Sequence, residues 1–192
     1  MTTRPLPAGI TPAQWVEAVS GEDHWLEIVD GEFVSRRIGG NPHHYVAARL
    51  ARAFEDQWGA VACAPGNWAV READGVIVTG RIPDVLVDGP ELLADPVYSG
   101  VPLAAAEVWS PGNTLAEMNA KRQEYRAAGL PVLVEATLTD AGEVHLEWYA
   151  NRGERWELLA AAVGAGVLAV DEDRPFSVVP NALLSPPGAR PR

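Results

Sequence analysis

Two carboxylates stand out because each lies in an otherwise apolar stretch. Asp84 lies in "RIPDVLVD", and Glu107 lies in "LAAAEVWS", where no other charged residue occurs between positions 96 and 116. A carboxylate that faces the protein interior must be paired, protonated or bound to a metal. For Asp84 the alternative is an acid at a strand end, next to a turn made by Pro83. For Glu107 the alternative is a buried structural ion pair.

Lys121 is unusual because it is the only lysine among 15 basic Lys and Arg residues. An ammonium group is a compact point charge, whereas a guanidinium is a planar fork, so the single lysine suggests a site where the fork does not fit. Helical spacing places Lys121 at the border of the apolar face of "LAEMNAKRQEY". A lysine at such a border can also extend harmlessly to solvent, and this alternative is common.

His43 belongs to a helix-like stretch and aligns at helical spacing with Ala47, Leu50 and Phe54. We therefore expect His43 to face the core, and the adjacent His44 to face outward. Taken alone, His43 is more typical of a core histidine that bonds to the backbone.

Two carboxylates on neighbouring strands and a lysine make a recognisable kind of site. The carboxylates, with a backbone carbonyl such as that of Val108, can hold Mg²⁺ through oxygen ligands. Such a metal lowers the pKa of bound water, and a lysine can stabilise the hydroxide or the developing charge. The set Asp84, Glu107 and Lys121 thus indicates metal-assisted phosphodiester hydrolysis.

Regular elements must position these residues. Helices are expected over 11–20, 41–58 and 114–129, where Asn41 is the expected cap of the second, and Thr114 with Glu117 forms a capping box for the third. Hairpins are expected over 24–38, turning at Asp30–Gly31, and over 143–160. Further strands are expected at 60–66, 67–75, 76–89, 101–110, 130–138 and on to about residue 180, with a loop at 89–100. This order predicts an α/β fold with a mixed central β-sheet flanked by helices and additional β-hairpins.

The bulk composition limits the function. A chain of 192 residues fits one domain, expected over 1–184, with a flexible tail at 185–192. The net charge of −11 repels nucleic acid at long range, so a polyanion would need a locally basic groove. Cys63 is the only cysteine, and no signal peptide or membrane-length apolar run occurs, so a cytoplasmic location and no membrane are expected. The motifs GxSxG, HExxH, CxxC and the Walker loop are absent.

The chain resembles the Uma-two family of bacterial putative restriction endonucleases, in the PD-(D/E)XK nuclease superfamily. The residues that carry this resemblance span about 24–160, and the lysine follows the glutamate by fourteen positions, which matches Lys121. They are the ordered stretches "LEIVDGEFV" (26–34), "NPHHYVAARLARAF" (41–54), "IPDVLVD" (82–88), "AEVWSPGNT" (106–114) and "KRQEYRAAGLP" (121–131).

The resemblance implies a restriction-endonuclease-like core and a catalytic set of Asp84, Glu107, Lys121, His43 and Glu32, although Glu32 is as readily a surface charge on a hairpin. It implies Mg²⁺, with Mn²⁺ as a possible substitute, nucleic acid such as DNA as substrate, and a homodimer. The superfamily lysine usually lies two residues after the second acid, and here that position is Trp109.

A rival hypothesis is a non-catalytic binding or interaction module on the same scaffold. The acidic net charge favours it, as does the scarcity of clustered basic residues, for which Arg36–Arg37, Arg49/Arg52 and Lys121–Arg122–Arg126 are the candidates. A cavity that is uniformly acidic or filled by Trp109 would support the module, and a basic groove around converging acids would support the enzyme.

Overall fold

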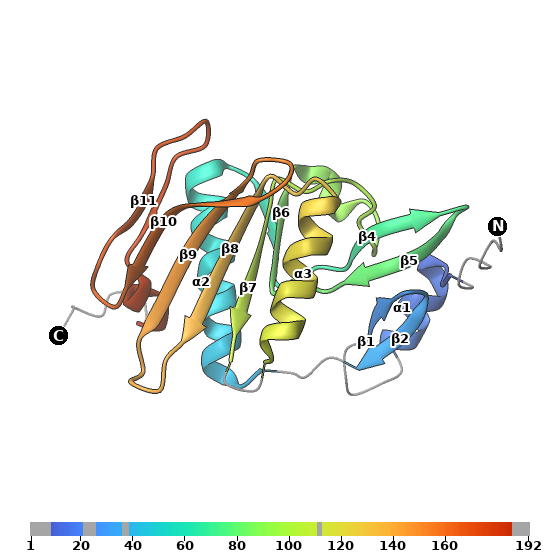
Figure 1. Cartoon of the computed structure of the whole chain (residues 1–192), viewed down its shortest axis with the longest axis horizontal. Coiled ribbons are helices and arrows are strands. Elements are labelled where there is room, and N and C mark those ends of the chain that lie inside the picture. The colour runs from blue at the N-terminus through green and yellow to red at the C-terminus, as the bar shows by residue number, and fades with distance from the viewer. Residues whose placement is uncertain (1–8, 21–25, 36–38, 111–112, 186–192) are drawn as a thin grey trace.

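The computed structural model describes residues 9–20, 26–35, 39–110 and 113–185. A six-stranded sheet runs through the middle of the molecule in the order β10-β9-β8-β7-β6-β3 (Figure 1). The β7–β8 pair is parallel and the other pairs are antiparallel, so the sheet is mixed as predicted. Its strands are β3 (Val61–Cys63), β6 (Val85–Asp88), β7 (Ala104–Trp109), β8 (Val132–Leu138), β9 (Val144–Asn151) and β10 (Trp156–Val163).

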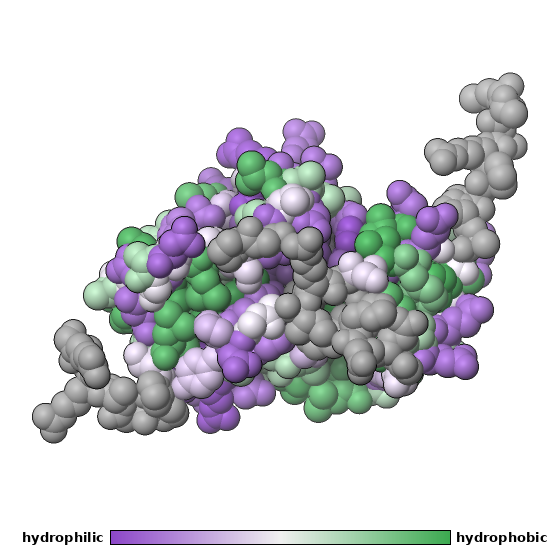
Figure 2. Space-filling view, turned by 90° about the horizontal axis from the view of Figure 1, so that it is seen from below, coloured by the Kyte–Doolittle hydropathy of each residue, from purple (hydrophilic) through white to green (hydrophobic). Residues whose placement is uncertain are grey.

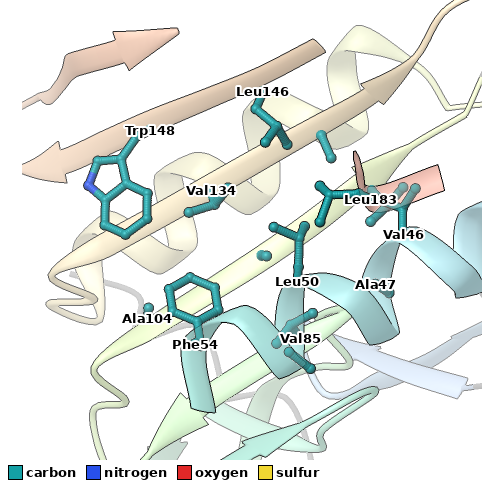
Figure 3. Close-up of a cluster of buried hydrophobic side chains, with 14 of the residues drawn as sticks. Val46, Ala47, Leu50, Phe54, Val85, Ala104, Val134, Leu146, Trp148 and Leu183 are labelled. Carbon is teal, nitrogen blue, oxygen red and sulfur yellow. The ribbon is translucent and has the colours of Figure 1, made fainter. Parts of the chain in front are cut away.

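Two helices cover opposite faces of this sheet (Figure 1). Helix α2 (Asn41–Trp58) packs Leu50 and Phe54 against Val85, Val134 and other buried side chains of one face, as Figure 3 shows. Helix α3 (Leu115–Ala127) connects the parallel strands β7 and β8 and packs Tyr125 against the other face. The sheet is therefore buried on both sides, which explains the nearly continuous apolar runs in its central strands.

A smaller sheet has the order β2-β1-β5-β4. Its strands are β1 (Leu26–Val29), β2 (Glu32–Ser35), β4 (Trp68–Ala73) and β5 (Val76–Arg81), and helix α1 (Pro12–Ser20) inserts Trp15 among their side chains. The β1–β2 turn forms at Asp30–Gly31, both with positive φ (49° and 81°), as the Asp-Gly signal predicts. Because β1 lies between β2 and β5, it is an interior strand of its sheet.

The helix starts show how local sequence fixes these elements. The capping box of α3 forms as predicted, because the Thr114 side chain accepts from the backbone N–H of Glu117 and the Glu117 side chain accepts from that of Thr114. Helix α2 begins differently from the prediction: Gly40 is the N-cap and Asn41 is already helical. Pro42 with its fixed φ is compatible with the first helical turn, so the helix can start without a side-chain cap.

The remaining described elements lie at the periphery. A 3-10 helix (Pro90–Leu93, η1) occupies part of the expected loop 89–100, and a second (Pro180–Leu184, η2) follows the short strands β11 (Leu168–Val170) and β12 (Phe176–Val178). Of the expected tail 185–192, residues 186–192 lie outside the described residues. None of the described helices is both long and apolar enough to cross a membrane. The surface seen in Figure 2 interleaves hydrophilic and hydrophobic residues.

Candidate active site

Asp84 and Glu107 occupy facing positions on adjacent strands. Val85 pairs with Ala106 and Leu86 with Ala105, so continuing this antiparallel register by one residue places Asp84 opposite Glu107. Both residues are buried, with 4% and 1% of their surfaces exposed. The sequence thus brings its two predicted acids to one end of the β6–β7 pair.

His43 and the backbone of Val108 both contact the Asp84 carboxylate. Its Oδ1 lies 2.9 Å from Nε2 of His43, and its Oδ2 accepts a hydrogen bond of 2.8 Å from the backbone N–H of Val108. Asp84 lies at a bend after Pro83, just before β6 begins, so it has the strand-end position of the alternative interpretation. The bend allows its carboxylate to reach His43 on α2, the histidine predicted to face inward and found 6% exposed.

Glu107 and Lys121 form a buried ion pair. The Lys121 Nζ atom lies 3.1 Å from Oε1 and 3.3 Å from Oε2 of Glu107, and the Tyr125 hydroxyl donates to Glu107 Oε1 at 2.6 Å. Burial, followed by the negative charges of Glu107 and Glu27, raises the pKa of Tyr125 well above its usual value, so the phenol keeps its proton and stays a donor. Lys121 is 7% exposed, so it does not extend to solvent from the helix border.

A third carboxylate, Glu27 on β1, joins the pair from the smaller sheet. Its Oε1 lies 3.0 Å from Lys121 Nζ and accepts from the backbone N–H of Ile82, while its Oε2 lies 2.7 Å from Arg81 Nη1. Arg81 also donates twice to Glu124 of α3, at 2.7 and 2.8 Å. Burial alone would lower the pKa of Arg81, but the hydrogen bonds and charges of Glu124 and Glu27 outweigh it and raise the pKa, so Arg81 is always charged.

Glu27 was not predicted as a site residue. Its place in "LEIV" suggests an ordinary hairpin strand, yet β1 is interior to its sheet and Glu27 is only 5% exposed. The sequence pointed to Glu27 only through its position inside the stretch "LEIVDGEFV" that carries the family resemblance. Its partners Arg81 and Lys121 are distant in the chain, so residue spacing could not identify them.

Three glutamates form a row across the central sheet. Glu107 pairs in register with Glu135 of β8, which pairs with Glu147 of β9. Arg122, next to Lys121 on α3, binds Glu135 through both Nε, at 2.7 Å, and Nη2. Consecutive cations of α3 therefore neutralise neighbouring carboxylates of the row.

A cavity of about 380 Å³ opens on this cluster. Its wall contains both charge signs, with Arg81 and Lys121 beside the acids, so it is not uniformly acidic. Trp109 contributes to the wall without filling the cavity, and Asp84 is not among the residues that line it. Glu107, His43, Ser110, Gly39, Gly40 and Lys121 are among the residues that line it.

Two other predicted site residues have different positions. Glu32 lies on the fully exposed strand β2, and it is not among the residues that line the cavity. Val108 is buried beside the site, and its backbone N–H is the group that contacts Asp84. Of the candidate basic patches, Arg36–Arg37 lies outside the described residues, and Arg52 is engaged by Glu55 and Asp56.

The donor set suits a hard divalent cation. Among residues 9–20, 26–35, 39–110 and 113–185, no group of three or more His, Cys, Asp or Glu side chains could hold a metal ion. Mg²⁺, however, is commonly held by one or two carboxylates while water and substrate phosphates complete its shell. The facing carboxylates therefore fit Mg²⁺.

Comparisons with known proteins agree with this fold. The family model for Uma2, described as "Putative restriction endonuclease", matches residues 13–177. The chain is similar to a crystal structure described as a putative nuclease belonging to DUF820 from Anabaena variabilis, with a TM-score of 0.59 and 10% identity over 84% of this chain and 89% of that chain. Because the two sequences are only 10% identical, this similarity is evidence for the fold alone. It confirms the predicted α/β nuclease-like fold. No curated protein matches the chain.

Proposed function

Because this chain belongs to the Uma2 family of putative restriction endonucleases, we propose that it is a divalent-metal-dependent nuclease of the PD-(D/E)XK type that hydrolyses phosphodiester bonds of nucleic acid. The observation that carries the proposal is the meeting of three residues distant in sequence. Asp84 and Glu107 face each other at one end of the β6–β7 pair, and Lys121 Nζ lies 3.1 Å from Glu107 Oε1 beside a cavity.

The roles follow from the chemistry of each group. Asp84 and Glu107, with the backbone carbonyl of Val108, would hold Mg²⁺. When bound, the ion lowers the pKa of water and offsets charge on a phosphoryl oxygen. The Lys121 ammonium lies at the cavity wall, where it stabilises developing negative charge on the phosphoryl group. His43 fixes one oxygen of Asp84 and so orients that carboxylate.

Calorimetric titration with Mg²⁺ or Mn²⁺ tests the metal site. Wild type should bind the metal, and Asp84→Ala and Glu107→Ala should each weaken binding by at least about tenfold, because even the loss of a group that only orients a metal ligand costs about 10–100-fold. Glu32→Ala is the matched control, because its carboxylate lies on exposed β2 and is expected to leave binding unchanged. Equal, negligible binding by all four proteins would refute the metal site.

A nuclease assay tests the reaction. Cleavage of single- and double-stranded nucleic acid should require the metal and should fall by about 10²-fold or more in Lys121→Ala, since removal of one stabilising donor typically costs that much. Arg126→Ala on the same helix is the control for a general loss of positive charge. Its guanidinium donates to the backbone carbonyl of Gly153.

A non-catalytic binding module is the second candidate. It is favoured by the complete pairing of Lys121, whose ammonium contacts both Glu27 and Glu107, and by the net charge of −11. Binding of nucleic acid without metal-dependent cleavage of any substrate would select this candidate over the nuclease.

The finer parts of the proposal rest on the sequence and the family. DNA is the proposed substrate, Mn²⁺ can replace Mg²⁺, and the protein acts as a cytoplasmic homodimer whose residues 1–184 form one nuclease-like domain. Size-exclusion chromatography with light scattering checks the dimer, and limited proteolysis checks the domain limit.

A further inference from the structure

Trp109 belongs to the cavity wall of the candidate site and is almost fully buried, with 4% of its surface exposed. It is the last residue of β7 and follows Glu107 by two positions, so strand alternation places both side chains on the same face of the sheet. Helix α3 packs against this face, and the Lys121 Nζ atom lies over the Trp109 ring, 5.9 Å from its centroid. Trp109 is therefore a direct neighbour of the ammonium that the proposed reaction uses.

The contact between the ring and the ammonium is of the cation–π kind. A lysine ammonium within about 6 Å of a ring centroid is attracted by the electron-rich face, most strongly by tryptophan, and removal from water strengthens the attraction. Lys121 is only 7% exposed. Its other neighbours, Glu27 and Glu107, are carboxylates at 3.0 and 3.1 Å. Unlike these acids, the ring is uncharged, so it attracts the ammonium without neutralising its charge.

The indole N–H of Trp109 does not explain why tryptophan occupies this position. Within the part of the chain that the structure describes, the Nε1 atom is buried and has no hydrogen-bond partner. The indole N–H can only donate, and a buried donor without an acceptor costs free energy that a phenylalanine would not incur. Proteins break such local rules mainly at functional sites. The large ring face beside Lys121 is the feature that accounts for the residue.

We propose that Trp109 is a positioning residue for Lys121, whose ammonium its ring face holds at the cavity wall with the positive charge directed to the substrate phosphoryl group. The inference rests on the role of Lys121 in the proposed function. It also gives a reason for a lysine here, because a compact ammonium can contact two carboxylates and a ring face at once.

The single lysine makes this contact observable by NMR. In full-length protein that contains isotopically labelled lysine, the only lysine side-chain signals come from Lys121, and neither metal nor substrate is needed. Protons over a ring face are shielded, so we expect the Lys121 Hε signal upfield of its position in urea-unfolded protein. The signal should move towards the unfolded position in Trp109→Leu. In Trp109→Phe, which keeps a ring without the N–H, it should stay closer to wild type.

The same variants test the consequence for cleavage of nucleic acid. Trp109→Leu should lower kcat by up to about 10²-fold, because a displacement of about 1 Å at a positioned group can cost that much. The KM should change little, since the lost interaction is one made with the transition state. Trp109→Phe should retain most of the activity, because a ring face remains beside the ammonium.

Trp58→Leu is the matched control. Trp58 also has a basic neighbour, since the Arg174 Cζ atom lies 5.6 Å from its ring centroid, but it is not among the residues that line the cavity. The same loss of a ring at this position should leave both the Lys121 signal and kcat unchanged. A change in either that equals the effect of Trp109→Leu would overturn the inference.

Three further outcomes would overturn it. These are an identical Lys121 signal in wild type and Trp109→Leu, an unchanged kcat in Trp109→Leu when Lys121→Ala is inactive, and a folded Trp109→Phe that is as impaired as Trp109→Leu. If circular dichroism shows that Trp109→Leu does not fold, the wild-type shift and Trp109→Phe decide the question. Failure of wild type to cleave nucleic acid would refute the proposed nuclease, whereas the NMR comparison would still show whether Trp109 holds the ammonium.

Discussion

The Nζ atom of Lys121 lies 3.0 Å from Oε1 of Glu27, a carboxylate contributed by the smaller sheet. Lys121 therefore contacts two acids, Glu27 and Glu107, that belong to different sheets and are both almost fully buried. The ion pair thus joins the two sheets at the candidate site, and the stability of the fold and the placement of Lys121 depend on the same contact.

Replacing Glu27 by Gln should destabilise the protein. The change leaves Lys121 and Arg81 with less compensating charge in a buried position, and breaking a buried ion pair typically costs about 3–5 kcal/mol. Urea denaturation measures the free energy of unfolding. The control is Glu32→Gln on exposed β2, where a change within about 0.5 kcal/mol is expected. Equal effects of the two substitutions would contradict a structural role for Glu27.

Replacing Tyr125 by Phe should change how stability depends on alkaline pH. Burial raises the pKa of Tyr125, so above the ordinary tyrosine pKa of about 10 the unfolded chain loses this proton while the folded protein keeps it. The unfolding free energy of wild type must then fall as pH rises, by up to about 1.4 kcal/mol per pH unit from this group. Tyr98 and Tyr149, whose pKa values are also raised, affect both proteins equally.

The measurement is the difference in unfolding free energy between wild type and Tyr125→Phe at about pH 9 and about pH 11. At the lower pH wild type should be more stable by about 1.5–3 kcal/mol, the usual value of a hydrogen bond to a charged group. The difference should shrink at the higher pH. A difference that stays constant would mean that Tyr125 ionises alike in both states.

Removal of divalent metal should abolish nuclease activity and leave the fold intact. Lys121 and Tyr125 already hold Glu107, and His43 and Val108 hold Asp84, so these carboxylates need no cation for folding. We expect EDTA to change the unfolding free energy in metal-free buffer by less than about 0.5 kcal/mol. Added Mg²⁺ should restore cleavage and raise the melting temperature with its concentration. Unfolding by EDTA would instead indicate a structural metal.

Replacing Thr114 by Ala should destabilise helix α3, which carries Lys121. The substitution removes the oxygen that accepts from the Glu117 backbone N–H, and loss of an N-cap costs about 1 kcal/mol. Thr114→Ser keeps that oxygen and is expected to retain most of the stability. Thermal unfolding measures both variants. Equal destabilisation by Ser and Ala would contradict a capping role for the Thr114 oxygen.

Local signals were enough to predict most of the fold. The Asp30–Gly31 turn, the Thr114 capping box and the apolar spacing of Leu50 and Phe54 each act within a few residues, and the elements they predict are present. Asn41 was wrongly expected to cap α2 because several polar or glycine residues near a helix start can fill that position, and tertiary packing selects among them.

The candidate site was predictable only where a residue contrasted with its own neighbours. Glu107 in an apolar run and Lys121 as the single lysine satisfied this condition, and the structure brings them together. Glu27 did not, because a glutamate in a short hairpin strand looks ordinary. Its burial depends on β1 being covered by β2 and β5, which is a consequence of sheet topology.

The row of glutamates across the central sheet fixes the position of α3. Lys121 is matched to Glu107 and Arg122 to Glu135, on adjacent strands. Shifting the helix by one residue would turn it by about 100° and displace it by about 1.5 Å, which would separate both pairs at once and leave two buried carboxylates uncompensated. The two ion pairs therefore both fix the register of α3 on the sheet. The Arg122–Glu135 pair thus constrains the position of Lys121, although Arg122 contacts neither Asp84 nor Glu107 in these hydrogen bonds.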